Sequence, residues 1–260
     1  MDENKIENNI ENSPENKAEN NTLPNKNYSG GQNQSQIAGA IIIAGIIIAG
    51  AILLKDNIGT NTGTPKKLAD APIFNQCLDS AKYASAVADS LSKGRDAGVN
   101  ATPNLFILEG DKIVNTVNGA EPTAMITQKI DQALAGNGKV IANIKLDPVS
   151  SSDFMMGSLQ AKVTVVEYAD FQCPFCGKLF QETEPTIMNY VKDGKIDFVY
   201  RDFPFLGSES IRAAIAARCA ADQGKFWEYH DYLYNHQSGE NQGAFSDVNL
   251  KSFASVLKLK

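Results

Sequence analysis

VTVVEYADFQCPFC, residues 163–176, joins an apolar run to two cysteines, Cys173 and Cys176. The β-branched and apolar residues at its start predict a buried strand. After Pro174, residues such as Leu179 and Thr183 continue in helical rhythm, so the cysteines fall where the strand passes into a helix. A C-x-x-C pair at such a junction favours a redox-active dithiol.

The start of a helix gives Cys173 a distinctive electrostatic setting. Unpaired backbone N–H groups and the positive end of the helix dipole favour a thiolate there, and such thiols have pKa values of roughly 3.5–7.5. The thiolate is the nucleophile of disulfide exchange. Cys176, one helical turn later, is expected to be more buried and to resolve the bond. The alternatives are a structural disulfide or half of a zinc site, but the chain has no second C-x-x-C.

Glu167 interrupts the apolar strand six residues before Cys173. If its neighbours alternate, its carboxylate points into the core, where acids are rare and costly. We expect such an acid to exchange protons with Cys176 during thiol chemistry. The alternative is an outward-facing strand residue.

Composition limits the classes of function. The 260 residues carry a net charge of −6 and a pI near 5.0, which argues against a nucleic-acid partner. The sequence has no phosphate loop, dinucleotide fingerprint or Ser-His-Asp set, so no cofactor is expected. His230 and His236 are six residues apart and do not share a helical face, so no metal site is expected from them.

The first 67 residues differ in character from the rest. Residues 1–36 repeat Glu-Asn and predict a disordered, solvated tail. Residues 37–54, IAGAIIIAGIIIAGAILL, contain no charge and would span about 27 Å as a helix, which predicts a membrane anchor. Residues 55–67 form a polar linker. The positive-inside rule mildly disfavours export of the C-terminal part, because Lys55, Lys66 and Lys67 follow the anchor.

The remaining sequence alternates between helical and extended patterns. Helices are predicted at 80–97, 122–135, 208–223, 225–236 and 249–257, and from the motif to about 192 with an interruption at Pro185. Strands are predicted at 104–108, 112–118 and 196–201, with a short strand at 140–146 followed by a loop.

Three blocks of sequence, VTVVEYADFQCPFCGKLF, DFVYRDFPFL and AARCAADQGKFWEYHDYLY, resemble DsbA-like thioredoxin-fold oxidoreductases of the membrane-anchored bacterial type. These blocks form the N-terminal half of that family's domain. Blocks that resemble its C-terminal half, FNQCLDSAKY and GVNATPNLFI with a hairpin and a last helix, come first here, as residues 72–135. The resemblance implies an α/β, thioredoxin-like fold with a helical insertion.

The resemblance also assigns roles to individual residues. It implies that Cys173 is the attacking cysteine, that Cys176 is its partner, and that Glu167 is the family's buried acid. It matches Thr102-Pro103 to a cis-proline loop that offers backbone hydrogen bonds to a substrate peptide. Pro174 and Phe175, the dipeptide of the motif, are expected to contact substrate as well. Phe175 stands where the family often has His, and Phe cannot add a positive charge near the thiolate.

The swapped order of the halves predicts a circularly permuted domain. Residues 68–136 would supply the C-terminal-half elements, 137–147 a connector, and 148–260 the N-terminal-half elements with the motif and the helical region. Domain termini often lie close together at the surface, which makes this arrangement feasible. The alternatives are half-domains from a broken tandem, halves exchanged between two chains, or a misassembled gene.

Cys77 and Cys219 remain once the motif pair is set aside. A disulfide between them would close a loop of more than 140 residues and join the two halves. The simple loop-entropy model gives such a bond about 4–5 kcal/mol. The alternative is two buried, reduced cysteines that pack as small apolar side chains.

These observations together predict a single-pass, membrane-anchored thiol–disulfide oxidoreductase with its catalytic domain outside the cytoplasm. It would oxidise cysteines of exported proteins or peptides through a Cys173–Cys176 disulfide, and a membrane redox partner would reoxidise it. The alternatives are a reductase or isomerase, or a non-catalytic binding module that keeps the motif as a structural disulfide.

Overall fold

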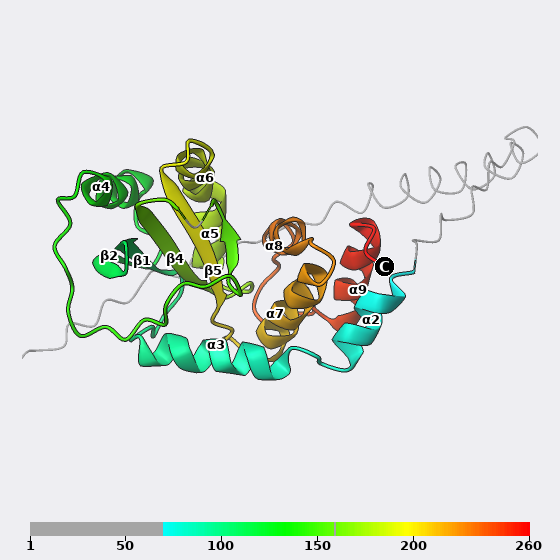
Figure 1. The fold of residues 1–260 in the computed structure, drawn as a ribbon. Helices are drawn as coiled ribbons and strands as arrows, with labels where there is room; N and C mark the ends of the chain where they lie inside the picture. The colour runs from blue at the N-terminus through cyan, green and yellow to red at the C-terminus, as the bar shows by residue number, and fades with distance from the viewer. Residues whose placement is uncertain (1–69, 159) are drawn as a thin grey trace, which may run out of the picture. The chain divides into compact units, whose positions relative to one another are not determined.

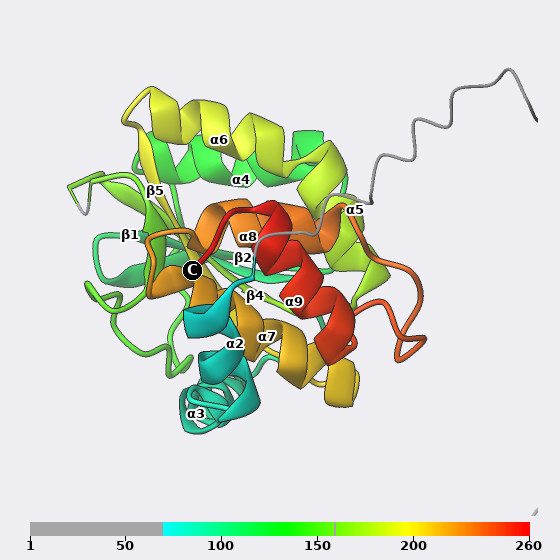
Figure 2. The same ribbon diagram turned by 90° about the vertical axis from the view of Figure 1, so that its right-hand side faces the viewer.

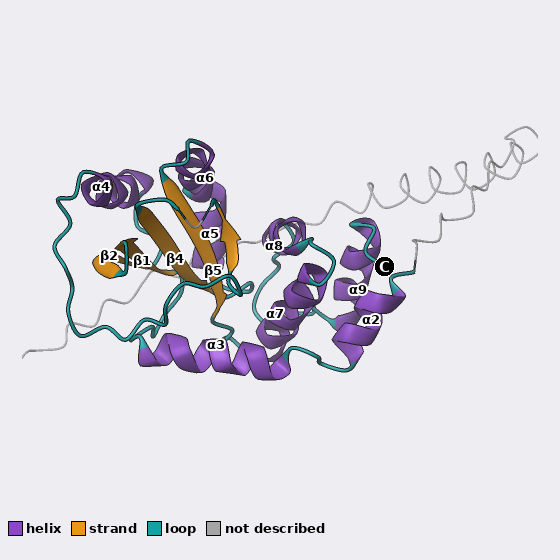
Figure 3. Cartoon of the chain, viewed as in Figure 1, coloured by secondary structure: helices purple, strands orange, loops and turns teal. Residues whose placement is uncertain are grey.

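The computed structural model describes residues 70–158 and 160–260, and its centre is one mixed sheet (Figures 1 and 3). The strands lie in the order β2-β1-β4-β5-β3. Their bounds are β1 Asn104–Glu109, β2 Lys112–Asn118, β3 Phe154–Met156, β4 Val163–Ala169 and β5 Ile196–Asp202. β4 and β5 are parallel, whereas the pairs β1–β2, β1–β4 and β3–β5 are antiparallel.

The strand that precedes the motif, β4, is the middle strand of the five. Its apolar run is buried from Val163 to Ala169 apart from Thr164. This explains why it reads as a continuous hydrophobic segment rather than an alternating one, as is typical of a strand covered on both faces. Because β1 pairs with β4, the hairpin from the first part of the chain lies directly beside the strand that leads to the cysteines.

Three helices cover one face of the sheet: α4 Thr123–Leu134, α5 Pro174–Glu182 and α6 Glu184–Lys192. In Figure 1 α4 and α6 lie above the strands, with α5 beneath α6. Their apolar residues at helical spacing, Ile126, Ile130 and Ile187 among them, form one core cluster with the strand residues Leu105, Ile107, Val165 and Phe198. Pro185 in the first turn of α6 explains the break between α5 and α6, since proline removes a backbone donor.

The opposite face is covered by α3, Ala84–Asp96, and by the connector that follows α4. Gly94 allows α3 to approach closely, because a Cβ atom there would lie 2.6 Å from a ring carbon of Phe203. Leu146 and Val149 of the connector pack against buried residues of this face, such as Val166 and Val199.

A separate layer of helices lies beside the sheet and contains α2 Pro72–Asp79, α7 Ser208–Ala221, α8 Phe226–Tyr234 and α9 Asp247–Val256. Figure 2 shows α2 and α9 next to each other, with Lys260 close by. The Phe74 N–H donates to the Lys260 carbonyl at 2.7 Å. Cys77 of α2 and Cys219 of α7 form a disulfide with an S–S distance of 2.00 Å.

Three predictions of local structure were wrong. Residues 140–146 form no strand, because Asn143 adopts a left-handed φ of +77° and only Ile141 N–H reaches a strand carbonyl, that of Ile113. The predicted loop before the motif contains the short edge strand β3. The helix expected from residue 80 begins only at 84, after Ala81 turns the chain at a φ of +49°.

The predicted membrane helix, residues 37–54, lies outside the described residues, as do the expected tail 1–36 and linker 55–67. Within 70–158 and 160–260, no helix combines the length and the apolar character needed to cross a bilayer.

Candidate functional site

Cys173 and Cys176 lie at the start of α5, directly after the central strand β4. Cys173 is the N-cap residue of the helix, with an extended backbone (φ −67°, ψ 121°), and Pro174 occupies the first turn. Both cysteines are free thiols in this structure, with exposed fractions of 4% for Cys173 and 1% for Cys176. The pair is therefore shielded, and the first cysteine is the more accessible of the two.

The two thiols have opposite electrostatic settings. The pKa of Cys173 is lowered to about 6, chiefly by a hydrogen bond from the Cys176 thiol and also by the backbone N–H groups of Phe175 and Cys176, against the effect of burial. The pKa of Cys176 is raised well above its ordinary value, first by burial and then by the negative charges of Cys173 and Glu167. At neutral pH the site therefore presents one thiolate and one protonated thiol.

Thr102 and Pro103 lie against the motif although they are about seventy residues distant in sequence. The Thr102–Pro103 peptide bond is cis, and the Cys173 thiol donates to the Thr102 carbonyl at 3.3 Å. The sequence could not establish the cis bond, since few X-Pro bonds adopt it. The structure thus brings together the motif and the loop that the family resemblance had paired with it.

Glu167 points into the core from β4, between Leu105 of β1 and Tyr200 of β5 in the register of the sheet. Its side chain is buried, and its Oε2 atom has no hydrogen-bond partner among the described residues. Burial raises its pKa to about 8, and the charge on Cys173 adds to the effect. The outward-facing alternative for Glu167 is therefore excluded, and the carboxyl holds a proton at neutral pH.

A polar network that sequence reasoning missed holds the segment before Cys173. The Asp170 carboxylate accepts hydrogen bonds from the N–H groups of Gln172, Phe205 and Leu206. The Gln237 amide donates to the carbonyls of Phe171 and Cys173. These partners come from segments that follow β5 and α8, so no local pattern around the motif indicates them.

The residues of the motif dipeptide differ from the cysteines in exposure. Phe175 is 60% exposed and stands immediately beside Cys173 in the first turn of α5. An exposed aromatic side chain next to the Cys173 sulfur offers apolar contact area at the surface of the site. Pro174 and Phe175 therefore form the solvent-facing border of the site.

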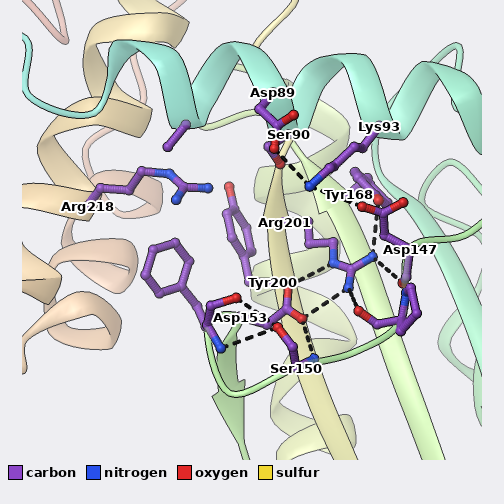
Figure 4. A pocket seen from close by; sticks show the side chains of 14 residues that line it. Asp89, Ser90, Lys93, Asp147, Ser150, Asp153, Tyr168, Tyr200, Arg201 and Arg218 are labelled. Carbon is purple, nitrogen blue, oxygen red and sulfur yellow. Dashed lines mark hydrogen bonds and ion pairs between the residues drawn. The ribbon is translucent and has the colours of Figure 1, made fainter.

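Arg201 forms an ion pair with Asp153 (Figure 4). It binds both carboxylate oxygens of Asp153 at 2.9 and 3.0 Å, whereas the neighbouring Asp202 accepts from Arg218 at 2.6 Å. The Arg201 ion pair lines a cavity of about 330 Å³ between α3, β5 and the connector, and neither cysteine is among its lining residues.

Comparison with known proteins finds similarities to part of the chain. The family model described as thioredoxin matches residues 150–258. A stretch of 95 residues is 32% identical to the probable disulfide bond formation protein D of Bacillus anthracis and covers 35% of this chain and 44% of that protein. Residues 150–258 are thus similar to thioredoxin, and part of the chain is similar to a disulfide bond formation protein.

Two further similarities of the chain are to proteins of other lengths. A stretch of 109 residues is 38% identical to the Na(+)/H(+) antiporter NhaA 3 of Salinispora tropica and covers 41% of this chain and 16% of that protein. The crystal structure of oxidised BdbD from Bacillus subtilis is 28% identical over 41% of this chain and 60% of that chain, with a TM-score of 0.38. The chain spans less than half the length of the curated relatives it matches.

Proposed function

We propose that this protein is a membrane-anchored thiol–disulfide oxidoreductase that oxidises cysteines of exported proteins. The observation that carries the proposal is the contrast between the two thiols of the motif. A lowered pKa at Cys173 stabilises the reduced form as a thiolate, and a protein whose dithiol form is stabilised is an oxidant. The border of Thr102, Pro103 and Phe175 supports a polypeptide as the substrate.

The reaction begins with the Cys173–Cys176 disulfide. A substrate thiolate attacks Cys173 Sγ, a new S–S bond forms, and Cys176 leaves as a thiolate. A second substrate thiolate then attacks the substrate sulfur of the mixed disulfide and expels Cys173. The substrate gains a disulfide, and the protein gains the two electrons that the substrate loses. Cys173 is a good leaving group because its thiolate is stabilised.

Cys176 requires a proton as it leaves, since its buried thiolate is unfavourable. The protonated Glu167 carboxyl is the buried acid that interacts electrostatically with both cysteines. We assign it as the proton source in oxidation and as the proton acceptor when a partner regenerates the disulfide. That partner accepts two electrons, for which a quinone-linked membrane protein is suited.

The redox potential tests the proposal most directly. The full chain in detergent is equilibrated with glutathione buffers, and the thiols are alkylated and read by mass. We expect Cys173 and Cys176 to titrate as one pair between the potentials of roughly −120 mV for DsbA and −270 mV for thioredoxin, because the pKa near 6 lies between theirs. A potential below about −300 mV, or a pair that never exchanges, would overturn the enzyme proposal and favour a structural disulfide.

Membrane anchoring through residues 37–54, with the domain outside the cytoplasm, is part of the same proposal. It is supported by the charge-free run in the sequence and by the chemistry, since disulfides persist in oxidising compartments. A membrane-impermeant thiol reagent should label Cys173 in intact cells after mild reduction. Labelling only after lysis would contradict the assignment to the outer side.

We further propose that the domain is a circular permutant of its family's fold. The sheet supports this, because β1 and β2 from the first part of the chain pair beside β4 from the second part. The hydrogen bond between Phe74 and Lys260 connects α2 with the residues that follow α9. In the unpermuted order of the family's fold, the chain would run continuously through this point. A chain in which residues 148–260 precede 70–136 should fold and show the same redox potential. If it does not fold while the parent does, the halves are not interchangeable and the permutation proposal fails.

A further inference from the structure

A second group of ionisable side chains lies on α6 and α8, away from the cysteines. Glu184 begins α6, and His230 and Asp231 lie within α8. One ligand atom from each of the three side chains lies within 4.8 Å of the other two, and His230 Nδ1 is 2.9 Å from Asp231 Oδ1. Residues almost fifty positions apart in sequence are thus gathered at one point.

Two members of this group are buried, and one has a polar atom without the hydrogen-bond partner that buried polar groups ordinarily have. Glu184 is 5% exposed. His230 is completely buried, and its Nε2 atom has no hydrogen-bond partner among the described residues. Burial raises the pKa of Glu184 to about 8. An ionised carboxylate in this position needs a positive charge beside it.

None of the residues that line the cavity beside Glu184 is cationic. Glu184 and Asp231 line a cavity of about 390 Å³. Its other lining residues are uncharged: Met156, Phe180, Gln181, Pro185, Met188 and Asn235. Metal binding displaces protons from the ligands, and the two carboxylates would then contribute a charge of −2, which one divalent cation would neutralise.

We propose that Glu184, His230 and Asp231 bind a divalent transition-metal cation of the Zn²⁺ type. Imidazole together with carboxylate suits Zn²⁺, whereas Ca²⁺ and Mg²⁺ prefer oxygen ligands alone. Bonds of about 2.0–2.2 Å to a tetrahedral ion place ligand atoms roughly 3.3–3.5 Å apart. The observed separations, up to 4.8 Å, contract to this value when the half-exposed Asp231 side chain rotates inward.

Such an ion would join two layers of the molecule. Glu184 follows immediately after Thr183, where the cysteine-bearing helix α5 ends, and α8 belongs to the helical layer. A cation held between them fixes the end of α5 against α8, and three protein ligands leave one coordination position for water. This role is independent of the proposed redox activity.

The test measures Zn²⁺ binding to the tag-free full chain in detergent, with Cys173→Ser and Cys176→Ser so that thiolates cannot bind the metal. Competition with a chromophoric chelator should give one tightly bound ion per chain. Glu184→Gln, which keeps the side-chain shape, should weaken binding at least about tenfold, as expected for loss of one direct ligand. Asp231→Asn should weaken it in the same direction.

Glu182→Gln is the matched control, because Glu182 lies two residues away and its side chain is 61% exposed. It should leave Zn²⁺ affinity unchanged. Zn²⁺ should also raise the unfolding temperature of the parent and of Glu182→Gln by several degrees, but not that of Glu184→Gln, and Ca²⁺ should raise none of them. Absence of Zn²⁺ binding, or equal affinity in the parent and in Glu184→Gln, would overturn the proposal.

Discussion

The molecule contains two pairs of cysteines with opposite surroundings. Cys77 and Cys219 are separated by 142 residues and form a disulfide among the apolar side chains of the helical layer. Cys173 and Cys176 are separated by two residues, lie at the start of a helix, and are free thiols beside a polar carbonyl and a buried acid. Apolar side chains surround the Cys77–Cys219 pair. The Cys173–Cys176 pair also lies beside polar and ionisable groups that give its two sulfurs different electrostatic surroundings.

The contrast indicates that the reactivity of a cysteine pair depends on a difference in pKa between its two thiols, and not on the presence of cysteine alone. Both pairs are buried, so accessibility alone does not separate them. In the motif pair, the helix start and the neighbouring charges lower the pKa of one thiol and raise that of the other. The helical-layer pair closes a long loop instead, which restricts the unfolded chain. We therefore expect substitutions in the two pairs to alter different properties.

The largest expected effect is on activity. Cys173→Ser should abolish oxidation of a reduced dithiol peptide, with a loss of more than about a thousandfold, because the attacked sulfur is gone. The double variant Cys77→Ala, Cys219→Ala should oxidise the peptide at nearly the parental rate when assayed below its unfolding temperature. Comparable losses in both variants would show that the two pairs do not divide their roles in this way.

The second effect is on stability. Removing the Cys77–Cys219 bond from its 142-residue separation should lower the free energy of unfolding by up to about 5 kcal/mol in the loop-entropy model. Urea titration of the double alanine variant against the parent measures the loss. Reducing only the motif disulfide should not lower the free energy of unfolding, because the folded protein stabilises the Cys173 thiolate of the dithiol form. A larger loss from the motif pair would reverse the comparison.

The third effect concerns Glu167, the buried acid whose charge helps to raise the pKa of Cys176. The folded pKa of Glu167, about 8, exceeds its unfolded value near 4.5, so the folded protein binds the extra proton between these values. The contribution of Glu167 to the free energy of unfolding is therefore fully present below about pH 4.5. It declines as the pH rises from there and is lost once the pH has passed through 8. Glu167→Gln, which cannot ionise, should remove this decline and be more stable than the parent at pH 9 by up to about 4 kcal/mol.

Urea titrations at pH 4 and pH 9 measure this difference, with the motif in its disulfide form, where the thiols do not titrate and burial alone raises the pKa of Glu167. At pH 4 the variant and the parent should be similar, because both side chains are neutral. A variant that is less stable than the parent at both values would show that the ionised carboxylate is favourable in the core, contrary to the burial argument.

The smallest expected effect is a tuning of the thiolate. Phe175→His places an imidazolium beside Cys173 below neutral pH and should lower the pKa of that thiol by about one unit, with a matching rise in redox potential. Thiolate absorbance followed against pH measures the shift. Phe175→Leu, which changes shape without adding charge, is the control and should leave the midpoint near the parental value of about 6.

The sequence predicted the parts of the site that have a local signature. The apolar run before Cys173 indicated β4, the extended patterns at 104–108 and 112–118 indicated β1 and β2, and the interruption of the strand by Glu167 indicated a buried acid. It did not reveal Asp170, Gln237 or the pairing of Arg201 with Asp153, since these contacts join segments that are distant along the chain. The prediction of a strand at residues 140–146 was wrong because a loop whose apolar residues pack against the core can have the same composition as a short strand.

The contact between Phe74 and Lys260 has a consequence for how this fold can be used. The backbone nitrogen of Phe74 and the carbonyl oxygen of Lys260 lie 2.7 Å apart, although the two residues are far apart in sequence. A short linker could therefore join these two segments of the helical layer without stretching the backbone.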